Sequence, residues 1–167
     1  MLEIIIFTLS LAMDQLVKYW SVTQLANMPV QTVPIIGRFL QFRYAENRAD
    51  NVSFIRGRSM VMNIVRILQV VLVLYLLIRH RKKLATITRV ALILFLAGLI
   101  GNQMNYLFMN YVPDMFTIWL IPNIVFNVAD VFVFVAMIIL FVRLAFFEGQ
   151  DLINWIVDRG TKSNTDE

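Results

Sequence analysis

The sequence NIVFNVADVFVFVAMIILFV, residues 123–142, is apolar except for two asparagines and one aspartate. A run of this length predicts a membrane-spanning helix, because about 20 apolar residues cross a hydrocarbon core about 30 Å thick. Asp130 lies inside the run, where lipid cannot hydrogen-bond a carboxylate and an isolated charge costs at least about 3 kcal/mol. The stretch FNVAD at 126–130 therefore predicts polar partners for Asp130 on neighbouring helices.

Apolar residues dominate the rest of the chain as well. Of the 167 residues, 59% are hydrophobic and 16% are charged, which is far from the composition of a soluble domain. The length leaves room for one compact bundle, so we expect a single integral membrane domain over residues 1–167. Four apolar stretches predict its spans, at about residues 2–20, 60–78, 90–109 and 122–147.

A polar segment over about residues 30–55 separates the first two spans. Its stretch QTVPIIGRFLQFRY, residues 31–44, partly alternates apolar and polar residues, and Pro34 and Gly37 are typical of turns. The pattern predicts short strands that form a small sheet outside the membrane. After the fourth span, apolar and charged residues alternate over about 150–159, which predicts a short helix on the inner membrane surface.

Basic residues indicate the orientation in the membrane. Arg79, Arg81, Lys82 and Lys83 cluster between the second and third spans, which places this loop in the cytoplasm by the positive-inside rule. Four spans then place both termini in the cytoplasm. The net charge of +4 lies mainly in loops and forms no basic, aromatic-rich stripe, so it favours a membrane surface over nucleic acid as the partner.

Polar residues in the third and fourth predicted spans share helix faces. In a continuous helix Asn123, Asn127 and Asp130 follow an i, i+4, i+7 pattern and point to one side. We expect this side to face the interior of the bundle, with Asp130 about two turns into the span. Asn102 and Asn105, three residues apart on the third span, predict a polar stripe that faces it.

Asp114 follows the third span and should lie at about the depth of Asp130. Two carboxylates close together cannot both ionise easily, so one can hold a proton while the other activates a water molecule. This pairing predicts acid–base catalysis or proton transport. The alternative is a structural role, in which Asp130 hydrogen-bonds Asn127 and Asn102 and joins two helices through contacts worth about 1 kcal/mol.

The first span carries Asp14 and Lys18, four residues apart on one helix face. An ion pair within the helix, with the Lys18 side chain extending to the membrane surface beside Tyr19 and Trp20, accounts for both residues. The alternative is that the pair supports a site or positions a substrate.

The available residue types narrow the chemistry. The chain has no cysteine, and its single histidine, His80, lies in the basic loop. Disulfides, thiolate chemistry and histidine metal clusters are therefore excluded. The carboxylates are too few and too widely spread to suggest a metal cage, so we expect neither a metal nor another cofactor.

Five short motifs, in their order and spacing, resemble the lipoprotein signal peptidase (signal peptidase II) family. They are DQLVK at 14–18, AENR at 45–48, GLIGN at 98–102, VPD at 112–114 and FNVAD at 126–130. The resemblance covers essentially the whole chain. It implies a four-transmembrane-helix bundle, all-α apart from a small extracytoplasmic β-cradle after the first helix, in the bacterial cytoplasmic (inner) membrane.

The resemblance also implies an activity. The family is an aspartyl protease that removes the signal peptide of prolipoproteins just before a diacylglyceryl-modified cysteine. A lipid-modified prolipoprotein and membrane lipid are thus the expected partners, and we expect a monomer. By the same resemblance Asp114 and Asp130 form the catalytic pair. The motif positions expected to bind substrate or support the site are Asp14, Lys18, Asn47, Asn102, Asn127 and Ala129.

Two stretches depart from the family's motifs. Where GNxxDR is expected the chain reads GNQMNY, which places Asn105 and Tyr106 at the last two positions, and NxGAAF is replaced by NRADNVSF at 47–54. These departures leave one alternative hypothesis, a non-catalytic or altered-substrate relative that binds lipidated peptides or lipid. A proton-coupled transporter that uses Asp130 is a third hypothesis, which the lack of an internal repeat disfavours.

Overall fold

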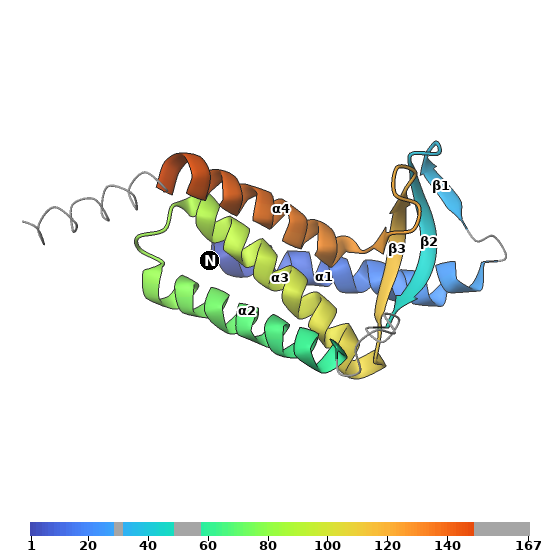
Figure 1. Ribbon diagram of the computed structural model, residues 1–167, viewed down its shortest axis with the longest axis horizontal. Coiled ribbons are helices and arrows are strands. Elements are labelled where there is room, and N and C mark those ends of the chain that lie inside the picture. The colour runs from blue at the N-terminus through green and yellow to red at the C-terminus, as the bar shows by residue number, and fades with distance from the viewer. Residues whose placement is uncertain (29–31, 49–57, 149–167) are drawn as a thin grey trace, which may run out of the picture.

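The structure is a computed structural model that describes residues 1–28, 32–48 and 58–148. This part of the chain folds into four long helices and one small sheet (Figure 1). The elements are α1 (Leu2–Thr23), the 3-10 turn η1 (Leu25–Asn27), β1 (Val33–Ile36), β2 (Leu40–Asn47), α2 (Arg58–His80), α3 (Thr86–Met109), β3 (Val112–Ile118), β4 (Val125–Phe126), α4 (Val128–Arg143) and the π-helical turn η3 (Leu144–Glu148). The surface helix expected at 150–159 lies outside the described residues.

The helices lie side by side, and the sheet covers the end of the bundle that is farther from the N-terminus (Figure 1). The central helix is α3, because it packs against α1, α2 and α4. Within the described ranges, two helical segments are long and apolar enough to cross a membrane, Thr86–Met109 and Val128–Phe147. The bundle is therefore arranged around one apolar helix that contacts the three others.

The first helix, α1, is polar on its buried side and apolar on its exposed side. Its buried residues are Ser10, Asp14, Lys18 and Ser21. By contrast, Ile4, Leu9 and Leu16 are 71%, 65% and 68% exposed. A helix of a water-soluble domain has the opposite distribution. The arrangement of α1 suits a lipid environment, in which polar groups must find their partners inside the protein.

The contact between α2 and α3 is apolar. Val73 of α2 forms a buried cluster with Leu92 and Leu96 of α3, and the partly buried Phe7 and Leu77 pack against it. The cluster lies in the half of α3 that is farther from the sheet, since β3 follows soon after the other end of the helix. Apolar packing thus dominates one half of the bundle and leaves the other half for polar residues.

The sheet combines two distant parts of the chain. β1 and β2 lie within the predicted segment 30–55, whereas β3 and β4 come from the connection between α3 and α4, and the antiparallel order is β1-β2-β3-β4. The β2–β3 register pairs Ala45 with Asp114 and Asn47 with Val112. We did not predict the strand β3 from the sequence. Most of its residues are buried. Asp114 therefore lies on a strand in the interior of the sheet rather than on a loop.

The helix expected over 122–147 begins only at Val128. The residues before it form a turn and β4, so Asn123 does not share a helix face with Asp130. Asn127 is the N-cap of α4, and Asp130 lies in the first turn rather than two turns into the helix. The physical reason is local, because an asparagine that accepts a bond from the N–H group three residues later ends the extended chain and starts the helix.

An aromatic row connects the end of α1 with the sheet. The ring centroids of Trp20 and Phe42 are 4.9 Å apart, those of Phe42 and Phe116 are 5.4 Å apart, and those of Phe116 and Phe126 are 5.9 Å apart. Such contacts contribute about 0.5–1.5 kcal/mol each beyond the burial of the rings. The row passes from α1 across β2, β3 and β4, so it fixes the sheet relative to the bundle.

The substitution Phe42→Ala removes the ring that contacts both Trp20 and Phe116. We expect the free energy of unfolding in detergent to fall by about 3 kcal/mol, which is typical for truncation of a packed phenylalanine. Phe39→Ala is the matched control, since Phe39 is 53% exposed and its truncation should change the same quantity by less than about 0.5 kcal/mol. Equal losses in the two variants would contradict the role of the row.

Candidate active site

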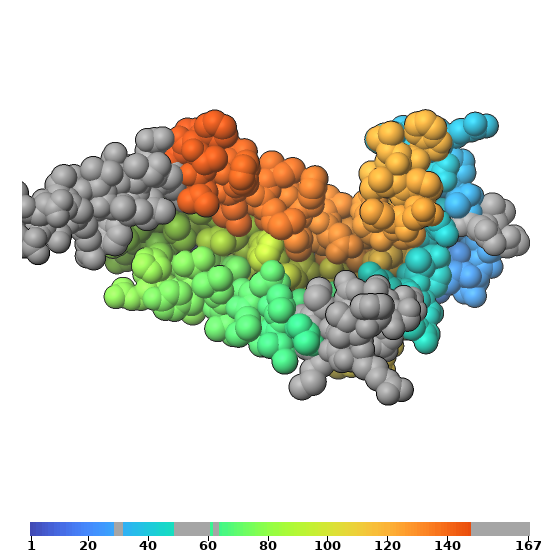
Figure 2. Space-filling view, in the orientation of Figure 1, coloured from blue at the N-terminus to red at the C-terminus, as the bar shows by residue number. Residues whose placement is uncertain are grey.

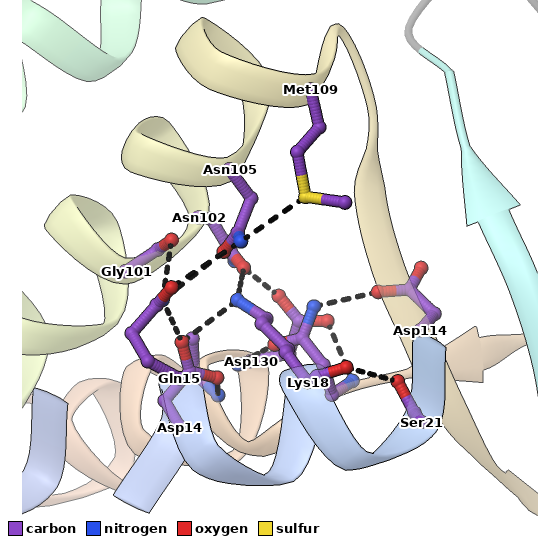
Figure 3. A network of polar contacts seen from close by, with 12 residues as sticks. Asp14, Gln15, Lys18, Ser21, Gly101, Asn102, Asn105, Met109, Asp114 and Asp130 are labelled. Atoms are coloured by element: carbon purple, nitrogen blue, oxygen red, sulfur yellow. Dashed lines mark hydrogen bonds and ion pairs between the residues drawn. The ribbon is translucent and has the colours of Figure 1, made fainter. Parts of the chain in front are cut away.

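Eight residues selected from the sequence meet where α1, α3 and the sheet approach the start of α4. Figure 3 shows Asp14, Lys18, Asn102, Asp114 and Asp130 among them. Hydrogen bonds join all of them into one connected network. They are Asp14, Lys18, Asn47, Asn102, Asp114, Asn127, Ala129 and Asp130. The fold therefore brings together residues from five separate stretches of sequence at one place.

Asn127 and Asp130 form a capping box at the start of α4. Asn127 Oδ1 accepts a bond of 3.0 Å from the Asp130 N–H group, and Asp130 Oδ2 accepts a bond of 3.1 Å from the Asn127 N–H group. The positive end of the helix dipole also favours a carboxylate at this place. The N-terminus of α4 thus stabilises the aspartate, which is why Asp130 can occupy an otherwise apolar stretch.

The side chain of Asn127 joins the two aspartates. Its Nδ2 donates a bond of 2.6 Å to Asp114 Oδ1, while its Oδ1 accepts from the Asp130 N–H group. The Asp130 N–H group determines the orientation of the amide, because it can only donate and therefore faces Oδ1. Asn127 is 1% exposed. Both aspartates are therefore held in fixed positions around one buried asparagine.

Asp114 is the more buried of the two aspartates, with 2% of its surface exposed. Its Oδ2 accepts a bond of 3.1 Å from Asn47 Nδ2. Burial, followed by the charge of Asp130, raises the pKa of Asp114 to about 7, although hydrogen bonds from Asn127 and Asn47 and the charge of Lys18 act in the opposite direction. At neutral pH a substantial fraction of Asp114 is therefore protonated and able to donate a proton.

A further bond reaches Asp130 from α3. Asn102 Nδ2 donates to Asp130 Oδ1 at 2.8 Å, and Asn102 Oδ1 accepts from Lys18 Nζ at 2.7 Å. The ammonium group can only donate, so it determines which end of the amide points to Asp130. One asparagine therefore connects the positive charge of Lys18 with the carboxylate of Asp130.

The expected ion pair of Asp14 and Lys18 is present, with 2.8 Å between Nζ and Oδ2. However, the two side chains are 0% and 1% exposed, so our expectation that Lys18 extends to the membrane surface is wrong. Inside the bundle Asp14 and Asn102 both accept bonds from the ammonium group, whereas lipid tails offer no acceptor. The pair belongs to the site rather than to the membrane interface.

Asp14 also holds the start of α4. Its Oδ1 accepts a bond of 2.9 Å from the N–H group of Ala129, one of the N–H groups that have no partner within a helix. Its Oδ2 accepts bonds of 2.8 Å from Lys18 and 2.9 Å from Gln15. By binding the first turn of α4, Asp14 positions the helix turn that carries Asp130.

Two glycines of α3 permit this close packing. A Cβ atom at Gly98 would lie 2.5 Å from the carbonyl oxygen of Ala129, and one at Gly101 would lie 2.6 Å from Asp14 Oδ2. Both distances are too short for carbon and oxygen atoms that are not bonded to each other. The GLIG stretch at 98–101 therefore allows α1 and α4 to approach α3 at the depth of the site.

Gln15 is a residue of this network that our sequence analysis missed. Its Nε2 lies 3.2 Å from the Gly101 carbonyl oxygen and 3.1 Å from Asn105 Oδ1, and Asn105 Nδ2 donates back to Gln15 Oε1 at 3.3 Å. The sequence feature that could have indicated Gln15 is its polar amide, which directly follows Asp14 in an apolar helix. Asn105, which departs from the family's motif, thus joins α3 to α1 through a pair of amides.

The titratable groups of the network are three aspartates and one lysine. Among the described residues, no group of three or more histidine, cysteine, aspartate or glutamate side chains could hold a metal ion. The greater part of the other departure from the family's motifs, residues 49–54, lies outside the described ranges. The network itself offers carboxylates, amides and one ammonium group.

Comparison with known proteins identifies the family. A sequence model described as signal peptidase (SPase) II matches residues 6–146. The chain belongs to this family. The lipoprotein signal peptidase of Clostridioides difficile (strain 630) is 34% identical over 150 residues, which cover 90% of this chain and 99% of the relative. That of Clostridium acetobutylicum is 32% identical over 144 residues, which cover 83% of this chain and 90% of the relative.

The fold of this signal peptidase II relative also occurs in solved structures. A bacterial membrane enzyme determined by the in meso method at 1.9 Å resolution matches with a TM-score of 0.74 and 21% identity, covering 87% of this chain and 93% of that chain. A second such structure, at 2.3 Å resolution, has a TM-score of 0.71. At this level of identity the similarity establishes the fold. Together with the family, it identifies the chain as a membrane protein.

The substitution Gly101→Ala tests the contact between α3 and Asp14. We expect it to lower the free energy of unfolding by about 1–3 kcal/mol, because the new methyl group displaces the Asp14 carboxylate from its donors. The measurement is unfolding in detergent, repeated in an Asp14→Ala background. There the clash is absent, so Gly101→Ala should be neutral or stabilising through its higher helix propensity. The same loss in both backgrounds would disprove the contact.

Proposed function

We propose that this protein is an aspartyl endopeptidase that removes the signal peptide from diacylglyceryl-modified prolipoproteins and cuts just before the lipidated cysteine. The main support is the arrangement in which Asn127 joins Asp114 and Asp130. Two carboxylates that share one proton at neutral pH can activate a water molecule and protonate its target. The substrate class follows from the family and from the names of the relatives.

The two aspartates have different surroundings and therefore different roles. Asp114 is buried and its pKa is about 7, so it serves as the acid. Asp130 accepts bonds from Asn102 and from the Asn127 N–H group at the positive end of α4. Asp130, held in place by these donors, serves as the base that takes a proton from water.

The reaction proceeds by attack of water on the scissile peptide bond. Asp130 takes a proton from the water as its oxygen bonds to the carbonyl carbon, and Asp114 donates its proton to the carbonyl oxygen. When the carbon–nitrogen bond breaks, the proton on Asp130 passes to the leaving amine. A hydroxyl proton of the tetrahedral intermediate returns to Asp114, so both aspartates regain their starting states.

We further propose that α1 to α4 all span the membrane, with the sheet on the outer side and both termini in the cytoplasm. Exposed basic residues at the end of α2 and in its connection to α3 support this orientation; they are Arg79, Arg81, Lys82 and Lys83. The aspartates then lie near the outer surface, where a lipid-modified prolipoprotein holds its cysteine. One chain supplies every residue of the network, which is consistent with a monomer.

The substitutions Asp114→Asn and Asp130→Asn test the pair. We expect each to reduce cleavage of a diacylglyceryl-modified prolipoprotein by at least about 10²- to 10⁴-fold, because each removes an acid–base step. The measurement is a gel-shift assay with purified protein in detergent. Glu46→Gln is the matched control, since this carboxylate is 36% exposed and pairs with Arg48.

Several outcomes would contradict the proposed function. Substantial residual turnover in either folded aspartate variant would exclude the pair as the acid and base. Cleavage of the unlipidated precursor at an equal rate would exclude lipid-dependent recognition. Absence of cleavage by folded wild-type protein that still binds the lipidated peptide would instead favour the non-catalytic relative.

The pH dependence of kcat/KM tests the assignment of Asp114 as the acid. We expect kcat/KM to fall as the pH rises through about 7, because the acid must be protonated and its pKa is about 7. Asn47→Ala removes a bond that stabilises the ionised carboxylate, so the pKa of Asp114 should rise and the falling limb should move to higher pH. A limb that stays in place or moves to lower pH would contradict the assignment.

A further inference from the structure

An apolar groove begins at Asp130. Its volume is about 610 Å³, and Asp130 is the only polar residue that lines it among the described residues. The apolar walls include Ile118 and Ile121 at the end of β3 and in the turn that follows, Phe126 of β4, and Val131, Phe134 and Met137 of α4. In Figure 2 the surface is hollowed where the connection between β3 and β4 rises beside α4.

The groove follows α4 away from the site. Asp130, Phe134 and Met137 are spaced i, i+4, i+7 and so lie along one side of the helix. Seven residues of helix extend over about 10 Å, which is about one third of a hydrocarbon core of 30 Å. In the proposed orientation, the groove descends from the outer membrane surface toward the middle of the bilayer.

We propose that this groove holds one acyl chain of the substrate's diacylglyceryl group during cleavage, an inference that rests on the proposed function. The lipid is attached to the cysteine that directly follows the scissile bond, so its chains must start close to Asp130 when that bond is attacked. An acyl chain needs no hydrogen-bond partner and runs from the membrane surface toward the bilayer centre. The groove matches both properties.

The dimensions of the groove favour a chain over a helix. The volume of about 610 Å³ lies in the range of about 300–1,000 Å³ that is usual for small-molecule sites. A signal-peptide helix is about 10–12 Å across with its side chains, so even a length of about 10 Å of it would need more than this volume. The helical part of the substrate therefore lies outside this groove.

A second, smaller groove provides a comparison. Its volume is about 330 Å³, and Leu16, Trp20 and Phe42 are among the residues that line it. None of its lining residues is titratable, and it lies beside α1 rather than α4. An acyl chain in this groove would not be continuous with Asp130. Of these two grooves among the described residues, the one along α4 is therefore the one that reaches Asp130.

The contribution of the α4 groove is placement rather than hydrophobic burial. The acyl chain leaves lipid to enter it, so little apolar surface is removed from water on binding. A seated chain instead restricts the position of the attached cysteine relative to Asp130, and misplacement by about 1 Å can cost a hundredfold in rate. The groove should therefore make cleavage depend on chain length.

Two substrates with the same peptide, one dipalmitoylated and one dioctanoylated, test the proposal. Met137→Trp narrows the end of the groove that is farther from Asp130. The longer palmitoyl chain extends into this end, whereas the shorter octanoyl chain depends on it less. We expect the ratio of kcat/KM for the long over the short substrate to fall about tenfold, in the range typical of steric misfit in a pocket. Ile138→Trp is the matched control, because Ile138 is 48% exposed on the same helix and does not line the groove.

The outcomes separate this inference from the proposed function. If wild-type protein cleaves both substrates and all three proteins show the same ratio, the groove assignment is wrong and the peptidase assignment stands. If folded wild-type protein cleaves neither substrate, both are wrong. A fall in the ratio confined to Met137→Trp supports the groove.

A photo-crosslinking experiment does not depend on the folding of Met137→Trp. The Asp114→Asn protein is incubated with a prolipoprotein peptide that carries a diazirine on its acyl chain, and the crosslinked residues are identified by mass spectrometry. We expect labels on α4 between residues 131 and 137 and on the β3–β4 connection. Labels found only beside Leu16 and Trp20, or only elsewhere on the lipid-facing surface, would overturn the assignment.

Discussion

The rest of the structure depends on how the buried carboxylate of Asp14 is satisfied. Lipid offers no donors, so the group takes bonds from Lys18, from Gln15 and from the N–H group of Ala129. Two of these donors lie on α1, but the third is the start of α4. Satisfying the charge of Asp14 therefore also sets the position of the turn that carries Asp130. Because α1 and α4 then lie close to α3, only glycine fits at positions 98 and 101 of α3.

Asparagine is the connecting residue throughout the network, for a physical reason. Its amide has a donor at one end and an acceptor at the other, so it can link an ammonium group or an N–H group with a carboxylate without adding a charge. Asn102 does so between Lys18 and Asp130, and Asn127 does so between the start of α4 and Asp114. The amides thereby hold both aspartates in place, as the proton exchange proposed for them requires.

The sheet and the helices each supply one side of the site. Asp114 is carried by a buried strand, and Asp130 by a helix terminus that is open to an apolar groove. The aromatic row fixes these two parts relative to each other. Under the proposed function, the scissile peptide bond and the lipid chain attached to the next residue meet at this junction.

By itself the sequence determined the apolar stretches that form helices, the strands between residues 33 and 47, and most residues of the network, because both hydropathy and the cost of an isolated polar group in lipid are local properties. It did not determine that α4 starts at Val128, that residues 112–118 form a strand, or that Lys18 turns inward beside Gln15. The strand depends on β2 and the inward Lys18 depends on Asn102, both far away in the chain. The start of α4 combines the local cap by Asn127 with a bond from Ala129 to the distant Asp14. Hydropathy shows that a polar group in lipid needs a partner, but only the tertiary structure decides which partner it finds.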